Sequence, residues 1–277
     1  MQDFSYFHES FNLRKLSSYF LQIQLCKLGV GYVITDTIRN QHIAIKHKAF
    51  ENPDENILTN FQNAVKEDVY LNKHYKTVNF LFISEKNSLI PADYFDKKHL
   101  KEYFKFNFIL SEQEEVHFNY IEKAKAYNIY SIPSTLINFL VNHFPEIRLY
   151  HYTTPLIKST FNDVGANNAF DTIRISIQNQ LMNIVIVKNQ KLIFFNDFDF
   201  HTEEDAVFYI MSVMKKLLVN LRRADVTIQG TIEKNGKLHK YLLKYIPEIK
   251  FHTKFDKEFP FSQIPNHIFA NLLDFEA

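Results

Sequence analysis

Residues 172–187 read Thr-Ile-Arg-Ile-Ser-Ile-Gln-Asn-Gln-Leu-Met-Asn-Ile-Val-Ile-Val, and this stretch decides the fold class. Polar and apolar residues alternate over Thr172–Ile177, which is the two-residue period of a half-buried β-strand. Asn179 and Gln180 form a turn signal, and Met182–Val187 predicts the returning strand. Residues 191–196, Lys-Leu-Ile-Phe-Phe-Asn, predict a third strand. The stretch therefore predicts a three-strand meander.

A helix is predicted directly after this meander. Thr202 is suited to cap it, Glu203 and Glu204 are acids in its first turn, and Asp205 stands at the capping-box position. Its apolar face is formed by Val207, Ile210, Met211, Met214, Leu217, Leu218 and Leu221. Another strand (226–229), a short helix (238–245) and a strand near Ile249 complete this part of the chain.

The first part of the chain repeats the same order of elements. Strands are predicted at 19–25, 32–35 and 42–47, with a turn over Gly29–Gly31 between the first two. A helix with Asn52 as its cap, Pro53 at its first position and Glu55 closing a capping box follows, then a strand at 77–83. The helical face consists of Ile57, Phe61, Ala64, Val65 and Val69. Three strands, a helix and a strand, occurring twice, indicate an internal structural repeat.

The repeat predicts the domain organisation. The first half covers 1–162 and carries an inserted segment at about 85–130, with a short helix at 91–95 and a hairpin around 122–127. It resumes with a helix at 134–143 and a strand at 146–151. Residues 162–169 have the composition of a linker, and the second half covers 171–260. The C-terminal segment 261–277 is predicted to be helical and to pack back on the body.

Composition excludes several classes of protein. The chain has 32 basic and 31 acidic residues, so no field steers it onto nucleic acid, and we expect no nucleic-acid partner. Cys26 is the single cysteine, which suits a reducing compartment, and its apolar strand indicates a small buried side chain. No signal peptide or membrane-spanning run is present, so we expect a cytoplasmic protein without an integral membrane segment. With only 5 glycines and no glycine-rich phosphate motif, a Rossmann site or P-loop is excluded.

The repeated plan resembles the actin-like ATPase fold, in which two ribonuclease-H-like halves carry mixed sheets with helices on their faces. More specifically, the chain resembles a bacterial family of unknown function from Bacteroidetes that is assigned this fold. Four stretches carry that resemblance: Leu21–Leu25, Asn87–Phe95, Lys191–Phe198 and Thr202–Ile210. The resemblance covers nearly the whole chain and implies an α/β protein. Its motifs are structural, and it implies no activity of its own.

The actin-like fold implies three places for nucleotide loops. The first is the turn containing Gly29 and Gly31, where the expected acidic residue is absent. The second is the turn at Asn179 and Gln180, which has neither the acid nor a glycine. The third, the adenosine motif, retains Gly230 followed by Thr231. These six residues are the candidate nucleotide cleft. Since magnesium needs carboxylate-held waters and phosphate needs backbone donors, we expect no cofactor, with ATP and magnesium as the alternative.

Other reactions lack their constellations. A ribonuclease-H-like nuclease needs carboxylates on its first strands, but 19–25 has none, Asp171 stands at a strand edge, and Asp197 and Asp199 end a strand. His201 and Asp205 have a metal-binding spacing, which the capping box explains without a metal. The histidines form no zinc motif, and no serine or cysteine hydrolase motif is present. We therefore predict no catalytic and no metal-ligating residues.

The leading hypothesis is a non-catalytic actin-like scaffold or adaptor for a protein partner not yet identified. The inserted segment 85–130 is the predicted partner surface, because insertions on rigid scaffolds carry specificity. An atypical ATP-binding or weakly hydrolysing protein is the alternative. A filament-forming protein is a third possibility that no residue in the sequence tests.

Overall fold

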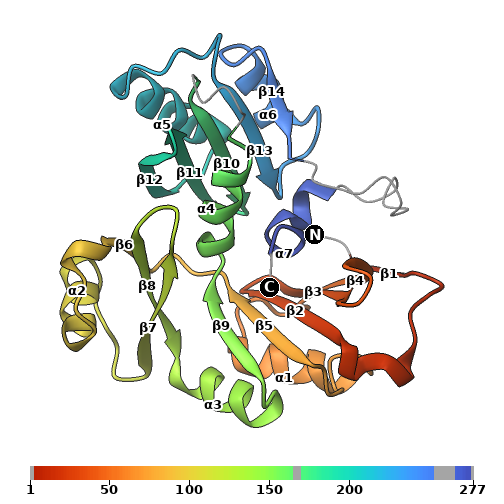
Figure 1. Cartoon of the computed structure of the whole chain (residues 1–277). Helices are drawn as coiled ribbons and strands as arrows, with labels where there is room; N and C mark the ends of the chain where they lie inside the picture. The colour runs from red at the N-terminus through yellow and green to blue at the C-terminus, as the bar shows by residue number, and fades with distance from the viewer. Residues whose placement is uncertain (1–2, 165–169, 253–265, 276–277) are drawn as a thin grey trace. The chain divides into compact units, whose positions relative to one another are not determined.

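The computed structural model describes residues 3–164, 170–252 and 266–275 (Figure 1). The chain divides into two compact units. Unit 1 comprises residues 1–120 and 125–154, and unit 2 comprises residues 121–124 and 155–277. The boundary falls at 154/155, inside helix α4 (Thr153–Asn162) and ahead of the predicted linker at 162–169.

The predicted linker residues 165–169 lie outside the described residues.

Unit 1 is built on a six-stranded sheet in the order β1-β4-β3-β2-β5-β9. The strands are β1 (Phe4–Phe7), β2 (Tyr19–Cys26), β3 (Gly29–Asp36), β4 (Gln41–Ala49), β5 (Thr77–Phe82) and β9 (Ile147–His151). The meander β2–β3–β4 is antiparallel, and β5 and β9 add in parallel. The predicted meander is confirmed, and β1 extends it. A short 3₁₀ helix, η1 (Leu13–Ser18), leads from β1 into β2.

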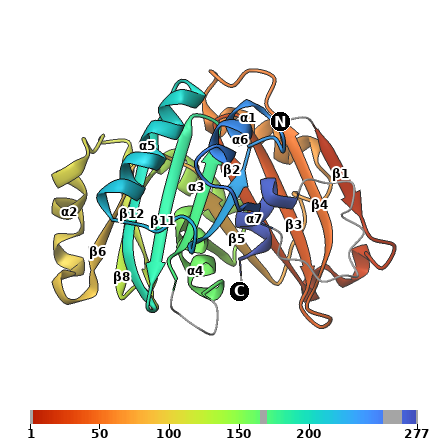
Figure 2. The same cartoon turned by 90° about the horizontal axis from the view of Figure 1, so that it is seen from above.

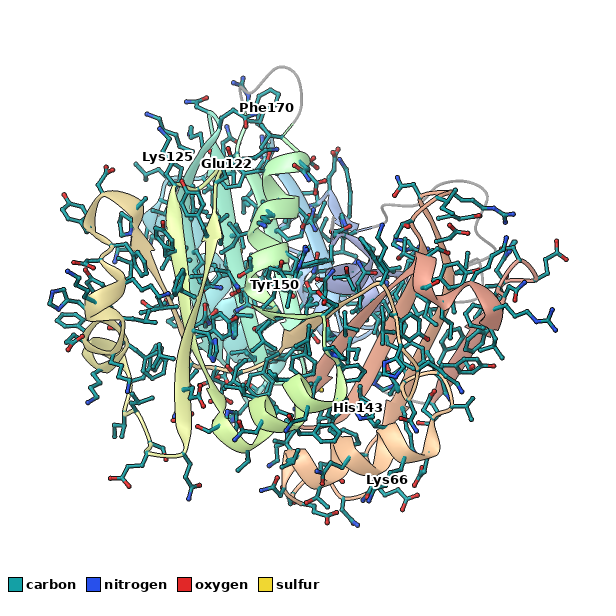
Figure 3. The ribbon with its side chains drawn as sticks, turned by 60° about the horizontal axis from the view of Figure 1, so that its bottom comes forward. Lys66, Glu122, Lys125, His143, Tyr150 and Phe170 are labelled. Atoms are coloured by element: carbon teal, nitrogen blue, oxygen red, sulfur yellow. The ribbon has the colours of Figure 1, made fainter. Side chains whose placement is uncertain are left out.

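Helices α1 (Ile57–Glu67) and α3 (Ser134–His143) cover one face of this sheet. Figure 3 labels Lys66 near the end of α1 and His143 at the end of α3. The ring of Phe61 on α1 packs 5.8 Å from Phe80 on β5 and 5.8 Å from Phe139 on α3. These aromatic side chains form part of the apolar core of unit 1.

The start of α1 differs from the prediction. Asn56, and not Asn52, is the N-cap, and its side-chain oxygen accepts from the backbone N–H of Leu58 at 2.8 Å. The carbonyl of Asn52 instead accepts from Glu55 N and from the side chain of Asn60. Residues 52–55 therefore form a turn before the helix. The chain has an asparagine suited to capping at both 52 and 56, and only Asn56 lies directly before the apolar face of the helix.

The inserted subdomain (residues 87–133) belongs to unit 1 except for residues 121–124, which are counted with unit 2. It holds a three-stranded sheet in the order β6-β8-β7, from β6 (Asn87–Pro91), β7 (Glu114–Ile121) and β8 (Ala126–Pro133). The predicted short helix appears as the 3₁₀ helix η2 (Ala92–Tyr94), and the predicted hairpin is formed by β7 and β8. A second 3₁₀ turn, η3 (Lys97–His99), leads into helix α2 (Leu100–Asn107), which was not predicted. Figure 2 shows α2 alongside β6 and β8.

Unit 2 is built on a five-stranded sheet in the order β12-β11-β10-β13-β14. The strands are β10 (Thr172–Gln178), β11 (Leu181–Lys188), β12 (Lys191–Asp199), β13 (Asp225–Gly230) and β14 (Ile249–Phe251). The meander β10–β11–β12 is antiparallel, and β13 and β14 add in parallel, as in unit 1. The predicted repeat of supersecondary structure is thereby confirmed.

Helices α5 (Glu203–Lys216) and α6 (Lys237–Leu243) pack their apolar residues on one face of this sheet. The opposite face is covered by α4 and by the C-terminal segment, which forms η5 (Asn266–Phe269) and α7 (Ala270–Leu273). As a result all seven residues of β10 are buried. The prediction of a half-buried strand at 172–177 was therefore wrong, because a second layer covers its polar face. In the part of the chain that the structure describes, no helix is long and apolar enough to cross a membrane.

Candidate functional site

The turn between β2 and β3 is a two-residue loop, Lys27-Leu28, and not the predicted turn over Gly29–Gly31. Gly29 begins β3, opposite Cys26, and Gly31 lies within β3, opposite Gln24. A Cβ atom on Gly29 would approach the carbonyl oxygen of Lys48 to 2.5 Å. The close approach of β3 and β4 thus accounts for this glycine. The assignment of Gly29 and Gly31 to a nucleotide cleft stays a prediction.

The corresponding turn in unit 2 does contain the two predicted residues. Asn179 has a φ of 59°, in the left-handed region that asparagine tolerates, and with Gln180 it joins β10 to β11. The carbonyl of Gln180 accepts from the backbone N–H of Phe200 at 2.9 Å. The residue that follows β12 therefore holds this turn in place through a backbone hydrogen bond.

Gly230 and Thr231 lie beside the same turn, at the end of the parallel neighbour β13. Gly230 has a φ of 93°, and a Cβ atom there would come within 1.8 Å of the carbonyl oxygen of Ile177. Only glycine fits this position, because both its backbone conformation and its distance from β10 exclude a side chain. The structure therefore brings Asn179, Gly230 and Thr231 together where the carboxyl ends of β10 and β13 meet, at one end of the unit 2 sheet.

Thr231 forms hydrogen bonds with the backbone groups at the carboxyl end of β10. Its backbone N–H donates to the carbonyl of Ile177 at 2.7 Å, and its hydroxyl oxygen accepts from the backbone N–H of Asn179 at 2.8 Å. The hydroxyl in turn reaches the Ile177 carbonyl at 3.4 Å. These bonds close β10 and β13 onto each other, so the amide at the tip of the turn already has a partner within the protein.

A phosphate and its magnesium ion place clear demands on such an edge. Phosphate oxygens need several backbone N–H groups that point outward, and Mg²⁺ needs carboxylates that hold its waters. The two turns offer Lys27-Leu28 in unit 1 and Asn179-Gln180 in unit 2, with no carboxylate in either. The Asn179 amide is bonded to Thr231. The residues of these two turns therefore do not fit a magnesium-nucleotide by the usual chemistry of the fold.

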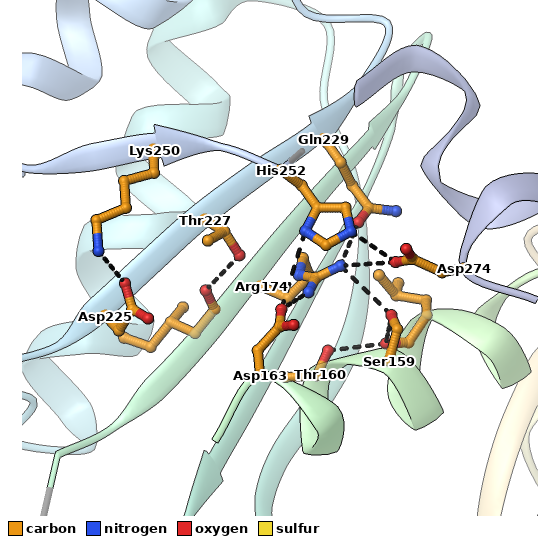
Figure 4. Close-up of polar contacts among 12 residues, drawn as sticks. Ser159, Thr160, Asp163, Arg174, Asp225, Thr227, Gln229, Lys250, His252 and Asp274 are labelled. Carbon is orange, nitrogen blue, oxygen red and sulfur yellow. Dashed lines mark hydrogen bonds and ion pairs between the residues drawn. The ribbon is translucent and has the colours of Figure 1, made fainter. Parts of the chain in front are cut away.

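A buried ionic cluster in unit 2 was not foreseen from the sequence (Figure 4). Arg174, in the middle of β10, is completely buried. Its Nη1 donates to Gln229 Oε1 at 2.7 Å and lies 3.3 Å from Asp274 Oδ2, and its Nη2 pairs with Asp163. Ser159 on α4 also accepts from Nη1 at 3.3 Å. His252 completes the cluster, with Nε2 2.7 Å from Asp274 Oδ2.

The charges of this cluster decide what it can do. Burial lowers the pKa of Arg174, and the Asp274 carboxylate opposes that shift, so the guanidinium stays charged between two carboxylates. The cluster joins β10 to residues 159–163 and to the C-terminal segment. It is consequently suited to hold the second layer of unit 2 in register. The signal in the sequence was Arg174 itself, a charge in the centre of an apolar strand.

A second buried polar group lies in unit 1, around His151. Its Nε2 lies 3.1 Å from the carbonyl oxygen of Ser84 and 3.2 Å from the Ser84 hydroxyl, and its Nδ1 lies 2.7 Å from the Thr153 hydroxyl. Since a carbonyl can only accept, we place the ring proton on Nε2. Complete burial lowers the pKa of His151 to about 3. A neutral ring with its proton facing Ser84 is not arranged to activate that serine as a nucleophile.

The remaining candidates have structural roles as well. The capping box is confirmed, with Thr202 Oγ1 accepting from Asp205 N and Asp205 Oδ2 accepting from Thr202 N. The predicted alternative of a metal at His201 and Asp205 therefore has no support from this geometry. Burial raises the pKa of the Cys26 thiol, which disfavours a thiolate nucleophile. Among the described residues, no group of three or more His, Cys, Asp or Glu side chains could hold a metal ion.

Fold and site together define the class: this is an α/β protein with the actin-like ATPase fold. A protein from Bacteroides thetaiotaomicron VPI-5482 with that fold and unknown function matches at a TM-score of 0.80 and 25% identity, over 87% of this chain and 93% of that chain. The PilM-PilN type IV pilus biogenesis complex matches at a TM-score of 0.55 and 9% identity, over 92% of this chain and 96% of that chain. No curated protein matches significantly.

The particular family follows from the sequence match. The family described as "Protein of unknown function (DUF3822)" matches residues 8–249, and the chain belongs to it. The resemblance inferred from the repeated plan is confirmed, both for the family and for the fold.

Proposed function

We propose that this protein is a non-catalytic actin-like scaffold that binds a protein partner through the inserted subdomain. The observation that carries the proposal is the bond from the Asn179 backbone N–H to Thr231 at 2.8 Å. A nucleotide-binding turn keeps such amides available for phosphate oxygens, because they are the donors that recognise it. Here the amide stabilises the sheet edge instead.

The inserted subdomain supports the second half of the proposal by its exposed apolar side chains. Phe106 and Ile109 are each 89% exposed, and Tyr94 is 75% exposed. Four lysines stand in the same segment: Lys97, Lys98, Lys101 and Lys105. Asp93, Asp96 and Glu102 stand among these lysines, so the exposed apolar side chains are the feature that suits a partner, one with apolar anchors. Phe104 on α2 is completely buried and anchors this helix on the sheet of the inserted subdomain.

Nucleotide binding is tested first, by thermal unfolding in millimolar Mg-ATP against Mg²⁺ alone. A ligand present at a hundred times its dissociation constant adds about 2.7 kcal/mol to the free energy of unfolding. We expect the same melting temperature in both buffers. A rise of several degrees in Mg-ATP that Thr231→Ser preserves would contradict the proposal and favour an atypical ATP-binding protein.

Partner binding is tested separately, with a photoreactive side chain at position 106 in the cells that encode the protein. We expect a discrete cross-linked protein whose contact segment is apolar, and whose binding to the purified chain is weakened by Ile109→Ser. The matched control is Ile38, which is 81% exposed in the turn between β3 and β4 of the same unit. Identical adducts from positions 38 and 106, or binding that Ile109→Ser leaves unchanged, would overturn this placement of the partner surface.

A further inference from the structure

Helices α5 and α6 of unit 2 leave an open groove between them on the side away from the sheet. The groove has a volume of about 560 Å³. Its apolar floor and walls are formed by Val207, Phe208 and Met211 from α5 and by Tyr241 and Tyr245 from α6 and its C-terminal end. Phe208 is 67% exposed and Tyr245 is 52% exposed. Two large aromatic side chains therefore stand in solvent at the rim.

The core of unit 2 accounts for only part of this apolar set. The residues of α5 that pack into the core are Ala206, Ile210, Val213 and Met214. Val207 packs against the margin of this core, whereas Phe208 is exposed, and with Met211 the two residues extend the apolar surface of α5 beyond the buried face of the helix. Burying a large apolar side chain contributes about 1.5–3 kcal/mol, so leaving Phe208 exposed forgoes a stabilisation of that order. Such a strip is typical of a surface that a partner covers.

The charge of the groove is unequal along its length. At the amino-terminal end, Glu204 is paired with Lys237 at 3.3 Å. At the carboxyl-terminal end, Lys215 and Lys244 line the groove, and the ammonium group of Lys244 lies 4.9 Å from the centre of the Tyr241 ring. Among the described residues, neither Lys215 nor Lys244 has a carboxylate within ion-pair distance. This end is therefore complementary to negative charge.

The shape of the groove selects the occupant. Lining residues on α5 run from Glu204 to Lys215, which is about 16 Å or three helical turns at 1.5 Å per residue. A helix laid between two helices fills such a groove with apolar side chains spaced three and four residues apart. A fatty acid would satisfy the lysines, but small-ligand sites enclose most of the ligand, whereas the exposure of Phe208 and Tyr245 leaves this groove open.

We propose that the α5–α6 groove binds an amphipathic α-helix of another protein, with carboxylates at the end that lies beside Lys215 and Lys244. This inference goes beyond the proposed function, since it concerns unit 2 and a second contact. A scaffold that links two proteins needs two independent surfaces, and the groove supplies one that shares no residue with the inserted subdomain.

The test begins with a phage-displayed library of helical peptides of about 16 residues, long enough to span the groove. Selection is made on the full chain. We expect enriched peptides to share apolar residues at positions i, i+3 or i+4, and i+7, with Asp or Glu at one end. Their affinities are then measured by fluorescence anisotropy. Phe208→Ser is expected to weaken binding about tenfold, while Ile193→Ser, at an exposed apolar residue on β12 of the same unit, leaves it unchanged.

A charge reversal tests the orientation of the helix. Lys215→Glu with Lys244→Glu is expected to weaken the acidic peptide about tenfold, and replacing the peptide's acids with lysine should restore binding to that variant. Lys191→Glu, on β12, is the matched control. Binding that ignores both Phe208→Ser and the charge reversal would overturn the proposal. A dimer in light scattering that Phe208→Ser converts to a monomer would also overturn it, because the occupant would then be a second copy of the chain. The same holds if laurate, a fatty acid, displaces a selected peptide from the wild type but not from Phe208→Ser.

Discussion

The carbonyl oxygen of Ile177 lies where a side chain on Gly230 would have to be, at 1.8 Å from an ideal Cβ atom. β10 and β13 are held together here by the two bonds of Thr231. This relationship explains the glycine of the adenosine-type motif by packing within unit 2, and it leads to the first prediction.

Gly230→Ala is expected to destabilise the protein in the absence of any nucleotide. The φ of 93° is strained for alanine, and the clash with Ile177 forces β10 and β13 apart. We expect a loss of at least about 2 kcal/mol in the free energy of unfolding, measured with urea. Gly236→Ala is the control, at a helix N-cap, and should cost less than about 1 kcal/mol. Equal effects at the two positions would contradict the packing explanation.

Thr231→Val is expected to remove the acceptor for the Asn179 amide while keeping the shape of the side chain. A lost hydrogen bond of this kind costs about 1 kcal/mol. Hydrogen exchange at the Asn179 amide should become faster in the valine variant, and Thr231→Ser, which retains the hydroxyl, should exchange as the wild type does. Unchanged protection in Thr231→Val would mean that the bond contributes nothing.

The ionic cluster around Arg174 is expected to behave as one unit. Removing a single member leaves a buried charge without compensation, and Arg174→Met should cost about 3–5 kcal/mol. The pair Arg174→Met and Asp274→Asn should cost less than the sum of the two single variants, by about 1–3 kcal/mol. Urea unfolding of the four proteins in this cycle measures that coupling. Strictly additive losses would show that Asp274 and Arg174 do not act together.

The buried His151 predicts a dependence of stability on pH. Its folded-state pKa of about 3 lies below the value of about 6.5 in the unfolded chain, so the unfolded state takes up the proton first as the pH falls. The stabilisation is complete above pH 6.5 and is lost as the pH falls towards 3. From pH 7 to pH 5 this residue should remove about 2 kcal/mol from the free energy of unfolding.

His151→Gln tests that prediction, because glutamine keeps a donor and an acceptor but does not titrate. The variant should lose about 2 kcal/mol less than the wild type between pH 7 and pH 5, whatever its stability at pH 7. His201→Gln, at an exposed position, should keep the wild-type slope. An unchanged slope in His151→Gln would place the origin of the pH dependence elsewhere.

Local sequence accounts for most of the secondary structure. The alternation in Thr172–Gln178 is enough to predict a strand, and the box of Thr202 and Asp205 is enough to start α5, because both signals act over a few neighbouring residues. Helix α3 was predicted at its observed bounds, Ser134–His143. The order of these elements, occurring twice, was sufficient to indicate the actin-like architecture.

The tertiary structure decided what the polar positions do. Arg174 follows the same alternation as a solvent-facing residue, and only the layer of α4 and the C-terminal segment makes it a buried ion. In the sequence, Gly230 and Thr231 resemble parts of a nucleotide motif, whereas in the structure their contacts with Ile177 and Asn179 explain both residues. The sequence by itself determined the elements and their repeat, because hydrophobic period and capping are local. Which side chains are buried, paired or left exposed depended on residues far apart in the chain, since burial and charge pairing are properties of the packed protein.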